Sequence, residues 1–241
     1  MKNRFPSWTL GLLGILLLIL VPVIYYLPRA KASTDPAAHI PTKAVHVDHK
    51  DIVKGEFKTG QEVTRACLEC HEDAATEFMK TTHWTWESKA FDVPWRDEDV
   101  TIGKINQINN FCIGSQGNEN KCMSCHAGYG WEQGKETQQA NPENVDCLAC
   151  HADTGAYGKG LFGNPAEGVD LLAAAQSVRA TTRENCGKCH FDGGGGNGVK
   201  HGDLDESLYF PDESLDVHMG GEANMQCTDC HWTEDHQILG R

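Results

Sequence analysis

Ten of the eleven cysteines in this 241-residue chain belong to one repeated pentapeptide, C-x-x-C-H. Two thiols at this spacing can form thioethers with the vinyl groups of one haem, while the imidazole of the next residue binds the haem iron. The cysteine pairs are Cys67 and Cys70, Cys122 and Cys125, Cys147 and Cys150, Cys186 and Cys189, and Cys227 and Cys230. The histidines that follow them are His71, His126, His151, His190 and His231. The repeat predicts five covalently bound haem c groups.

Other chemistry of C-x-x-C pairs fits less well. Such pairs also bind zinc or act as redox dithiols. Neither role requires a histidine directly after the second cysteine, yet all five pairs have one. Haem is therefore favoured over zinc or disulfide bonds, and only Cys112 lies outside the motifs.

Histidines that could bind the distal face of each haem are in surplus, since seven remain for five positions. The predicted distal ligands are His49, His83, His201, His218 and His236, and the less favoured candidates are His39 and His46. Haem iron with two histidine ligands has no free position for substrate and relays electrons at low potential. We expect mostly bis-histidine haems.

The density of motifs predicts the fold class. About 42 residues of residues 33–241 are available for each motif, so the cofactors themselves supply much of the core. We expect a multihaem cytochrome c fold of mainly short α-helices and long loops wrapped around closely packed haems. The aromatic residues Trp84, Trp86, Phe91 and Trp95 are expected to pack against haem or core.

Helix-start signals precede three of the motifs. Thr59 to Glu62 has the form of a capping box, and so has Thr181 to Glu184. Asn141 with Pro142 offers an N-cap and a first-turn proline before Cys147. A further helix is predicted over residues 165–178, where apolar residues recur on one face.

The N-terminal segment predicts a membrane helix. Residues 5–27 contain no charge, and about 20 apolar residues can cross a bilayer. Lys2 and Arg4 favour a cytoplasmic N-terminus. The predicted organisation is a membrane anchor or uncleaved signal at 1–28, a polar tether at 29–58 and a haem domain at 59–241. The alternative is a signal cleaved near Ala32, which would release a soluble periplasmic protein. Both interpretations place the haem domain on the periplasmic side of the cytoplasmic membrane.

The formal net charge of −13 is unevenly distributed, because the first 32 residues hold four basic residues and no acid. An acidic haem domain disfavours nucleic acid and steers towards basic partners. We expect no nucleic acid to bind.

Several stretches between and around the motifs resemble the octahaem tetrathionate reductase family of multihaem cytochromes. They cover most of residues 59–239 and include residues that do not bind haem. The stretches are TRACLECHEDAATEFMKTTHWTW, GKINQINNFCI, KCMSCHAGYGW, NVDCLACH, TRENCGKCHF, GGGGNGVKHGDLD and CTDCHWTEDHQI.

This resemblance implies a catalytic haem at the motif that ends in His126. It implies that Lys200 is the distal ligand of that haem and that Cys112 lines the pocket. Two departures stand out: the chain has five motifs where the family has eight, and Asn197 occupies a position where the family has an aspartate. Asn197 cannot supply a negative charge or a carboxyl proton.

Three functions follow as hypotheses. The first is electron transfer between redox proteins such as other cytochromes, a quinol dehydrogenase or a terminal reductase. The second is reduction of tetrathionate, nitrite, hydroxylamine or a similar sulfur or nitrogen compound at the haem bound by Lys200. The third is quinol oxidation. A partner chain or a second copy would supply further haems.

Overall fold

The computed structural model describes residues 8, 12, 14–20, 46–109, 112–131, 140–191 and 196–239. The chain divides into two units, Met1–Val45 and His46–Arg241. In the first unit residues 14–20 are helical. Within the described ranges no helix is both long and apolar enough to span a bilayer. The rest of the predicted anchor, the alternative cleavage site near Ala32 and His39 lie outside the described residues.

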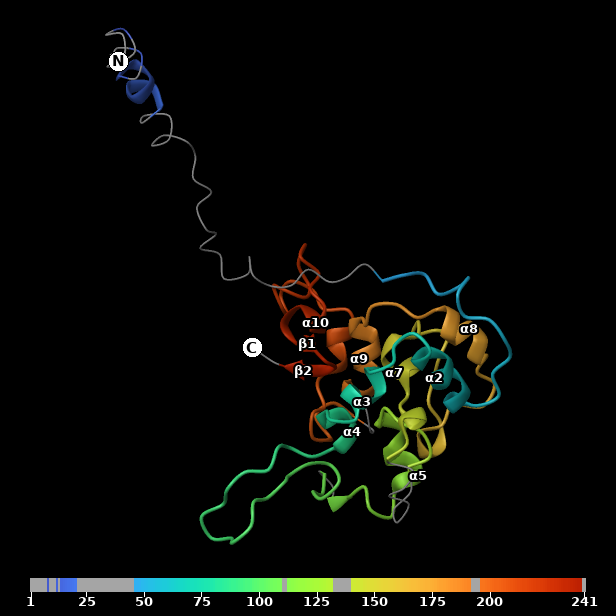
Figure 1. The fold of residues 1–241 in the computed structure, drawn as a ribbon. Coiled ribbons are helices and arrows are strands. Elements are labelled where there is room, and N and C mark those ends of the chain that lie inside the picture. Colours follow the sequence, from blue (N-terminus) through green and yellow to red (C-terminus); the bar gives the residue numbers. More distant parts are fainter. Residues whose placement is uncertain are drawn as a thin grey trace, which may run out of the picture. The chain divides into compact units, whose positions relative to one another are not determined.

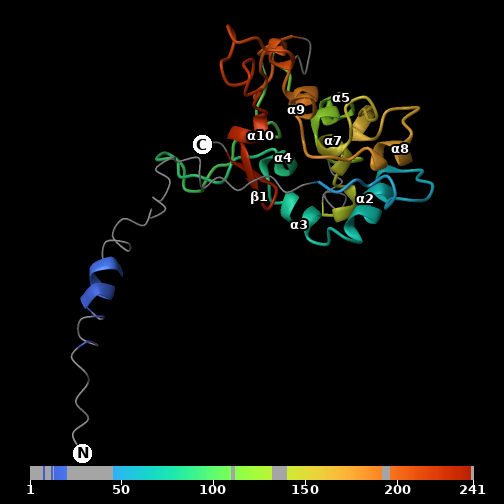
Figure 2. The same cartoon turned by 90° about the horizontal axis from the view of Figure 1, so that it is seen from above.

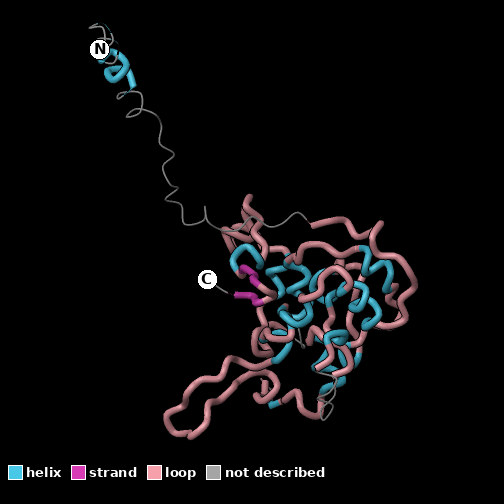
Figure 3. Tube along the Cα trace, in the orientation of Figure 1, coloured by secondary structure: helices cyan, strands magenta, loops and turns pink. Residues whose placement is uncertain are grey.

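The second unit consists of short helices joined by long loops, as predicted (Figures 1 and 3). Its α-helices are α2 (Gly60–Leu68), α3 (Ala74–Phe78), α4 (Thr82–Thr85), α5 (Glu119–Cys122), α7 (Cys147–His151), α8 (Leu171–Gln176), α9 (Arg183–His190) and α10 (Cys227–Cys230). Its 3-10 helices are η3 (Met123–Cys125), η4 (Pro142–Asn144), η5 (Leu161–Gly163) and η6 (Glu206–Tyr209). The strands β1 (Trp232–Glu234) and β2 (Gln237–Leu239) form an antiparallel hairpin.

Two groups of buried side chains form the core of this unit. The tryptophan cluster comprises Ala75, Phe78, Trp84, Trp86, Met123, Ala127, Trp131 and Val145. The alanine cluster comprises Val63, Leu148, Ala152, Tyr157, Leu171, Ala174 and Ala175. Val53 and Phe57 pack against the alanine cluster, and the backbone oxygen of Val53 accepts a hydrogen bond of 2.9 Å from Gln176. The last part of the predicted tether therefore packs onto the second unit.

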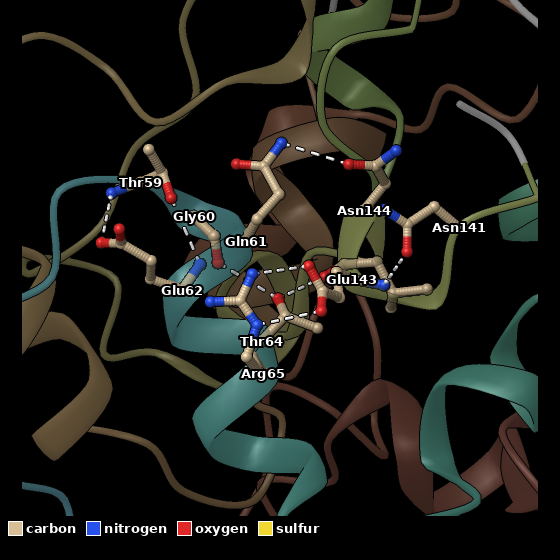
Figure 4. A network of polar contacts seen from close by, with 10 residues as sticks. Thr59, Gly60, Gln61, Glu62, Thr64, Arg65, Asn141, Glu143 and Asn144 are labelled. Carbon is tan, nitrogen blue, oxygen red and sulfur yellow. Dashed lines mark hydrogen bonds and ion pairs between the residues drawn. The ribbon is translucent and has the colours of Figure 1, made fainter. Parts of the chain in front are cut away.

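Helix α2 begins as its sequence predicts. The side chain of Thr59 accepts a hydrogen bond from the backbone nitrogen of Glu62, and the Glu62 carboxylate accepts one from the backbone nitrogen of Thr59 (Figure 4). This capping box satisfies backbone donors that a helix end leaves without intrahelical partners.

Polar contacts fasten α2 to the segment before the third motif (Figure 4). Arg65 makes a two-pronged ion pair with Glu143 of η4, at 2.9 and 2.7 Å. The buried hydroxyl of Thr64 donates to the carbonyl oxygen of Val145 at 2.6 Å. These contacts hold the helix that delivers Cys67 against the turn that leads to the third motif.

Two predicted helix starts are shifted. Helix α9 is capped by Thr182, whose backbone nitrogen donates to the Asn185 side chain, so the predicted box of Thr181 with Glu184 is wrong by one residue. Asn141 and Pro142 do open a helix, but it is the single turn η4. The helix of the third motif, α7, begins after Asp146, whose carboxylate accepts a hydrogen bond from Ala149.

The helix predicted over residues 165–178 is shorter than expected. Only α8 forms, and Asp170 caps its start. Gly168 adopts a φ of +84°, a left-handed conformation that glycine tolerates and that interrupts a right-handed helix. Leu171 and Ala175 of the predicted apolar face are buried, as expected.

The four aromatic residues expected to pack together separate into two pairs. Trp84 and Trp86 are buried in the tryptophan cluster. Phe91 and Trp95 are exposed, with Trp95 at 83%. They belong to residues 87–102, a long loop that projects from the second unit (Figures 1 and 2) and is closed by backbone hydrogen bonds between Phe91 and Val100. The prediction of core packing is wrong for this pair, while packing against haem stays a prediction.

Candidate haem-binding sites

Helical geometry brings the three chemical groups of a C-x-x-C-H motif together. Residues at positions i, i+3 and i+4 lie on one face of a helix, so both thiols and the imidazole can reach one ligand. The third and fourth motifs, numbered in chain order, lie within α7 and α9 up to their histidines. The second motif differs, because it spans α5 and η3 and His126 has an extended backbone.

Cysteine side chains of different motifs lie side by side. The neighbouring pairs are Cys67 with Cys147, Cys125 with Cys189, and Cys186 with Cys227. Helix α9 also packs against α7 of the third motif. The first motif therefore neighbours the third, while the fourth motif neighbours the second, third and fifth.

Two pairs of histidine rings lie at a spacing at which both rings could bind one metal ion. A metal–imidazole bond of about 2.0 Å, with roughly 1.1 Å from nitrogen to ring centre on each side, separates two such ring centres by roughly 6.2 Å. The ring centres of His49 and His71 are 6.3 Å apart, and those of His83 and His190 are 6.1 Å apart. Each pair joins a predicted distal ligand to the histidine of a motif. The described residues thus fit bis-histidine haem at the first and fourth motifs.

Hydrogen bonds fix the orientation of several of these rings. His49, His151 and His190 each donate from Nδ1 to a backbone carbonyl, which leaves Nε2 free to bind a metal. The accepting carbonyls are those of Val47 at 2.7 Å, Arg179 at 3.1 Å and Gly202 at 2.6 Å. Such outer contacts set the tautomer and raise the basicity of the coordinating nitrogen.

His236 reaches the third motif from the C-terminal hairpin. Asp235 and His236 have φ values of 46° and 60°, which make the tight turn between β1 and β2. The Nδ1 atom of His236 lies 2.9 Å from the carboxylate of Glu77. Burial lowers the pKa of His151, and the nearby His236 lowers it further, so His151 stays in the neutral form that binds metal. His236 is thus a neighbour of His151, and its role as a distal ligand stays a prediction.

The second motif places its histidine in an aromatic cage. His126 is completely buried, and its ring centre lies 5.2 Å from Trp84, 5.2 Å from Trp86 and 4.2 Å from Trp131. Burial lowers the pKa of His126 to about 3. Its Nε2 lies 2.8 Å from the carbonyl oxygen of Trp84, so binding iron through Nε2 requires that contact to open. Within the described ranges no other histidine ring contacts His126.

Lys200 lies beside this second motif, as the predicted role requires. It lines a cavity of about 20 Å³ together with Cys122, Cys125, Lys104 and Asn109. Two lysines, Lys104 and Lys200, make the cavity electropositive, and it has room for about one water molecule.

The two other residues predicted to be catalytic lie elsewhere. Cys112 is exposed, with a φ of 58°, and its backbone nitrogen donates to Asn109. Asn197 is exposed, and its side-chain oxygen accepts a 2.9 Å hydrogen bond from the backbone nitrogen of Glu206. Neither lines the cavity beside Lys200, and Asn197 has a structural role at the start of η6.

The remaining histidines are not paired across a metal position in the described part of the chain. The Nε2 atom of His201 lies 3.1 Å from the carbonyl oxygen of Ile108. His218 is exposed beside Asp216, and His231 of the fifth motif is also exposed. His46 contacts the ring of His49. Distal ligation by His201 and His218 therefore stays a prediction.

A buried ion pair beside the third motif was missed from the sequence. The Asp146 carboxylate accepts hydrogen bonds from Tyr129 at 2.9 Å, Tyr157 at 2.8 Å and the backbone of Ala149 at 3.0 Å. It also pairs with Lys159 at 2.6 Å, and both side chains are almost inaccessible to solvent. The position of Asp146 directly before Cys147 was the available signal.

Other residues missed from the sequence gave no local signal. Glu77 contacts His236, and Lys104 lines the cavity beside Lys200. Both contacts join residues far apart in the sequence, so they arise only when the chain folds. Trp131 ends the stretch KCMSCHAGYGW that contains His126, but nothing in the spacing shows that it packs against that ring.

Known proteins match this arrangement. A family model described as "Cytochrome c7 and related cytochrome c" matches residues 108–191, which contain the second, third and fourth motifs. An uncharacterized protein of Archaeoglobus fulgidus is 22% identical over 240 residues, with 80% of each chain covered.

A solved structure matches more strongly. The crystal structure of octaheme cytochrome c from Shewanella oneidensis is similar with a TM-score of 0.70 and 50% sequence identity. The match covers 81% of this chain, which spans 43% of the length of that one. Together with the repeated C-x-x-C-H motifs and the spacing of the histidine pairs, these matches show that the chain is a multihaem c-type cytochrome.

Proposed function

We propose that the chain is an electron-transfer protein that carries five haem c groups and is anchored on the periplasmic side of the cytoplasmic membrane. The spacing of the two histidine pairs, at 6.3 and 6.1 Å, supports this function most directly. When bound, haem c supplies an iron centre that accepts and releases single electrons.

The protein's own residues have two tasks in this function. The paired imidazoles occupy both faces of a site, which excludes substrate and favours relay over catalysis. Neighbouring cysteines bring the first motif close to the third, and packing of α7 against α9 brings the third close to the fourth, so these attachment points lie next to one another.

Removing one distal ligand tests the ligand pairs. In the His83→Ala variant, we expect electron paramagnetic resonance of the oxidised protein to lose one low-spin signal and gain a high-spin signal. Thr82→Ala, an exposed change in the same helix, controls for damage to α4 and should leave the spectrum unaltered. An unchanged low-spin spectrum in His83→Ala would refute ligation by His83.

Anchoring rests on the uncharged segment 5–27 and on the basic residues before it. We expect washed membranes to retain the protein in high salt and to release it in detergent. Release by salt alone would refute the anchor and favour cleavage near Ala32.

A second function, reduction of a small sulfur or nitrogen compound, is supported by the second motif. His126 has a tryptophan cage where the first and fourth motifs have a histidine partner, and two lysines line the adjacent cavity. Lys200 would bind iron as a neutral amine, so Lys104 supplies the positive charge that suits an anionic substrate such as tetrathionate or nitrite. A lysine amine is also a ligand that substrate could displace.

Replacing Lys200 by Ala tests this second function. We expect one haem signal to change and reductase activity to fall in the Lys200→Ala variant. Lys121→Ala is the matched control, because Lys121 is an exposed lysine next to Cys122. If the Lys200→Ala spectrum matches that of the control, Lys200 is not a ligand.

A further inference from the structure

A groove lined by apolar and acidic side chains lies on residues 204–217, which we call the Phe210 surface. The groove has a volume of about 430 Å³ and is lined in part by Phe210 and Leu215. Phe210 is 88% exposed and Val217 is 63% exposed. Large apolar side chains gathered on a surface mark sites of interaction, whereas scattered ones do not.

Negative charge surrounds this groove. The acidic residues of the segment are Asp205, Glu206, Asp212, Glu213 and Asp216. Between Asp203 and Val217 there is no lysine or arginine. Hydrogen bonds from Ser207 and Ser214 lower the pKa of Asp205 and Asp212, respectively, so both are ionised at neutral pH.

The same segment is joined directly to the fourth motif. The backbone nitrogen of Leu204 donates to the carbonyl oxygen of His190 at 2.6 Å. The Tyr209 ring packs edge-on against Phe191, with ring centres 4.8 Å apart. In Figure 2 this orange-red segment lies beside α9 at the edge of the unit. A protein bound to the Phe210 surface would therefore lie next to the motif that contacts three others.

We propose that the Phe210 surface is the docking site of a basic electron-transfer protein, which exchanges electrons with this chain through the fourth motif. The inference rests on the proposed electron-transfer function and adds the place and the charge of the partner. At protein interfaces, a central aromatic residue often supplies much of the affinity. Charges around it raise the association rate with a partner of opposite charge.

Mitochondrial cytochrome c, a lysine-rich redox protein, is the probe for the test. The reduced holoprotein is mixed with the oxidised probe, and the bimolecular rate is recorded against ionic strength. The docking variant is D205N/E206Q/D212N/E213Q, in which asparagine keeps the acceptors that hold the loop. The control variant is D92N/D97N/E98Q/D99N, which removes the same charge from the exposed loop 87–102.

At low ionic strength we expect the docking variant to react about tenfold more slowly than wild type, with a flatter salt dependence, and the control variant to stay within about twofold. We expect Phe210→Ala to weaken binding of the probe, measured by calorimetry, while the salt dependence remains. Equal losses in both charge variants would overturn the proposal, because the charge would then act globally. Self-association of the wild type that Phe210→Ala abolishes would also overturn it, by assigning the surface to a second copy.

Failure of the electron-transfer function itself is recognised separately. If the reduced holoprotein does not reduce small-molecule oxidants either, the proposed function fails. If it does so at the wild-type rate in every variant while the probe shows no preference for the Phe210 surface, only the docking site is wrong.

Discussion

The buried ion pair of Asp146 with Lys159 makes a quantitative prediction about stability. Replacing Lys159 by Met keeps the length of the side chain but removes its charge, and leaves the Asp146 carboxylate with its bonds to Tyr129, Tyr157 and Ala149. The lost contacts are the 2.6 Å ion pair and a 3.2 Å hydrogen bond from Lys159 to the carbonyl oxygen of Gly128.

The expected loss of folding stability follows from the burial of both side chains. Exposure of the two side chains is 8% for Lys159 and 0% for Asp146. Removing one partner of a buried pair costs about 3–5 kcal/mol, because the remaining charge is left uncompensated. Three hydrogen bonds still stabilise the Asp146 carboxylate, so we expect the lower end, about 3 kcal/mol. With a denaturant slope of about 4 kcal/mol per molar, the guanidinium midpoint falls by about 0.8 M.

Guanidinium unfolding of the holoprotein, followed by far-ultraviolet circular dichroism, measures this loss. Arg65→Met is the matched control, because Arg65 makes a two-pronged pair with Glu143 that is 57% and 35% exposed (Figure 4). Exposed pairs contribute little, so its midpoint should stay close to that of the wild type. If the midpoint of Lys159→Met is no lower than that of Arg65→Met, the buried ion pair of Asp146 with Lys159 does not stabilise the fold as argued.

Adding Asp146→Asn to the lysine change completes the test. The double variant should be more stable than the sum of the single effects predicts, since neither charge is then left without its partner. We expect a coupling of about 1–3 kcal/mol. Strict additivity would show that the two side chains do not interact.

Three further predictions concern the first motif and α2. The Cys67→Ala/Cys70→Ala variant should bind one haem fewer in a pyridine haemochrome assay, and an unchanged count would refute covalent attachment there. Thr64→Val should destabilise the protein by about 1–2 kcal/mol in the same unfolding assay, because the buried carbonyl of Val145 loses its donor. The backbone nitrogen of Lys58 lowers the pKa of Glu62, so the carboxylate stabilises the fold above its unfolded pKa of about 4.5 and loses that effect as the pH falls through its folded pKa. The stability difference between wild type and Glu62→Gln should therefore vanish in acid, and persistence there would contradict the capping role.

Local signals in the sequence predicted local structure well. The capping box of Thr59 and Glu62 depends on residues three apart, so the sequence alone specifies it. The shifted start of α9 shows the limit of such signals. Thr181 and Thr182 are equivalent as caps, and the hydrogen bond from Thr182 to Asn185, a residue outside the predicted box, marks Thr182 as the cap.

Chemistry that depends on distant residues was predicted only in part. The histidine surplus and the motif spacing predict which residues are ligands, and the structure places two predicted distal histidines, His49 and His83, opposite motif histidines. The pairing could not, because His83 and His190 meet only after the chain has folded. The same holds for the tryptophan cage of His126, whose members come from both sides of the projecting loop.

The contacts between motifs show which haem-binding motifs are neighbours. The first motif contacts the third, and the fourth contacts the third, the second and the fifth. The fourth motif is thus a junction: one branch leads to the electropositive cavity beside Lys200, another to the fifth motif, and its own segment leads to the Phe210 surface. Electrons that enter at a docking site next to the junction could reach the cavity without passing the first or third motif. Loss of docking should therefore slow delivery from a protein donor while leaving the spectrum of the second site unchanged, which separates entry from chemistry.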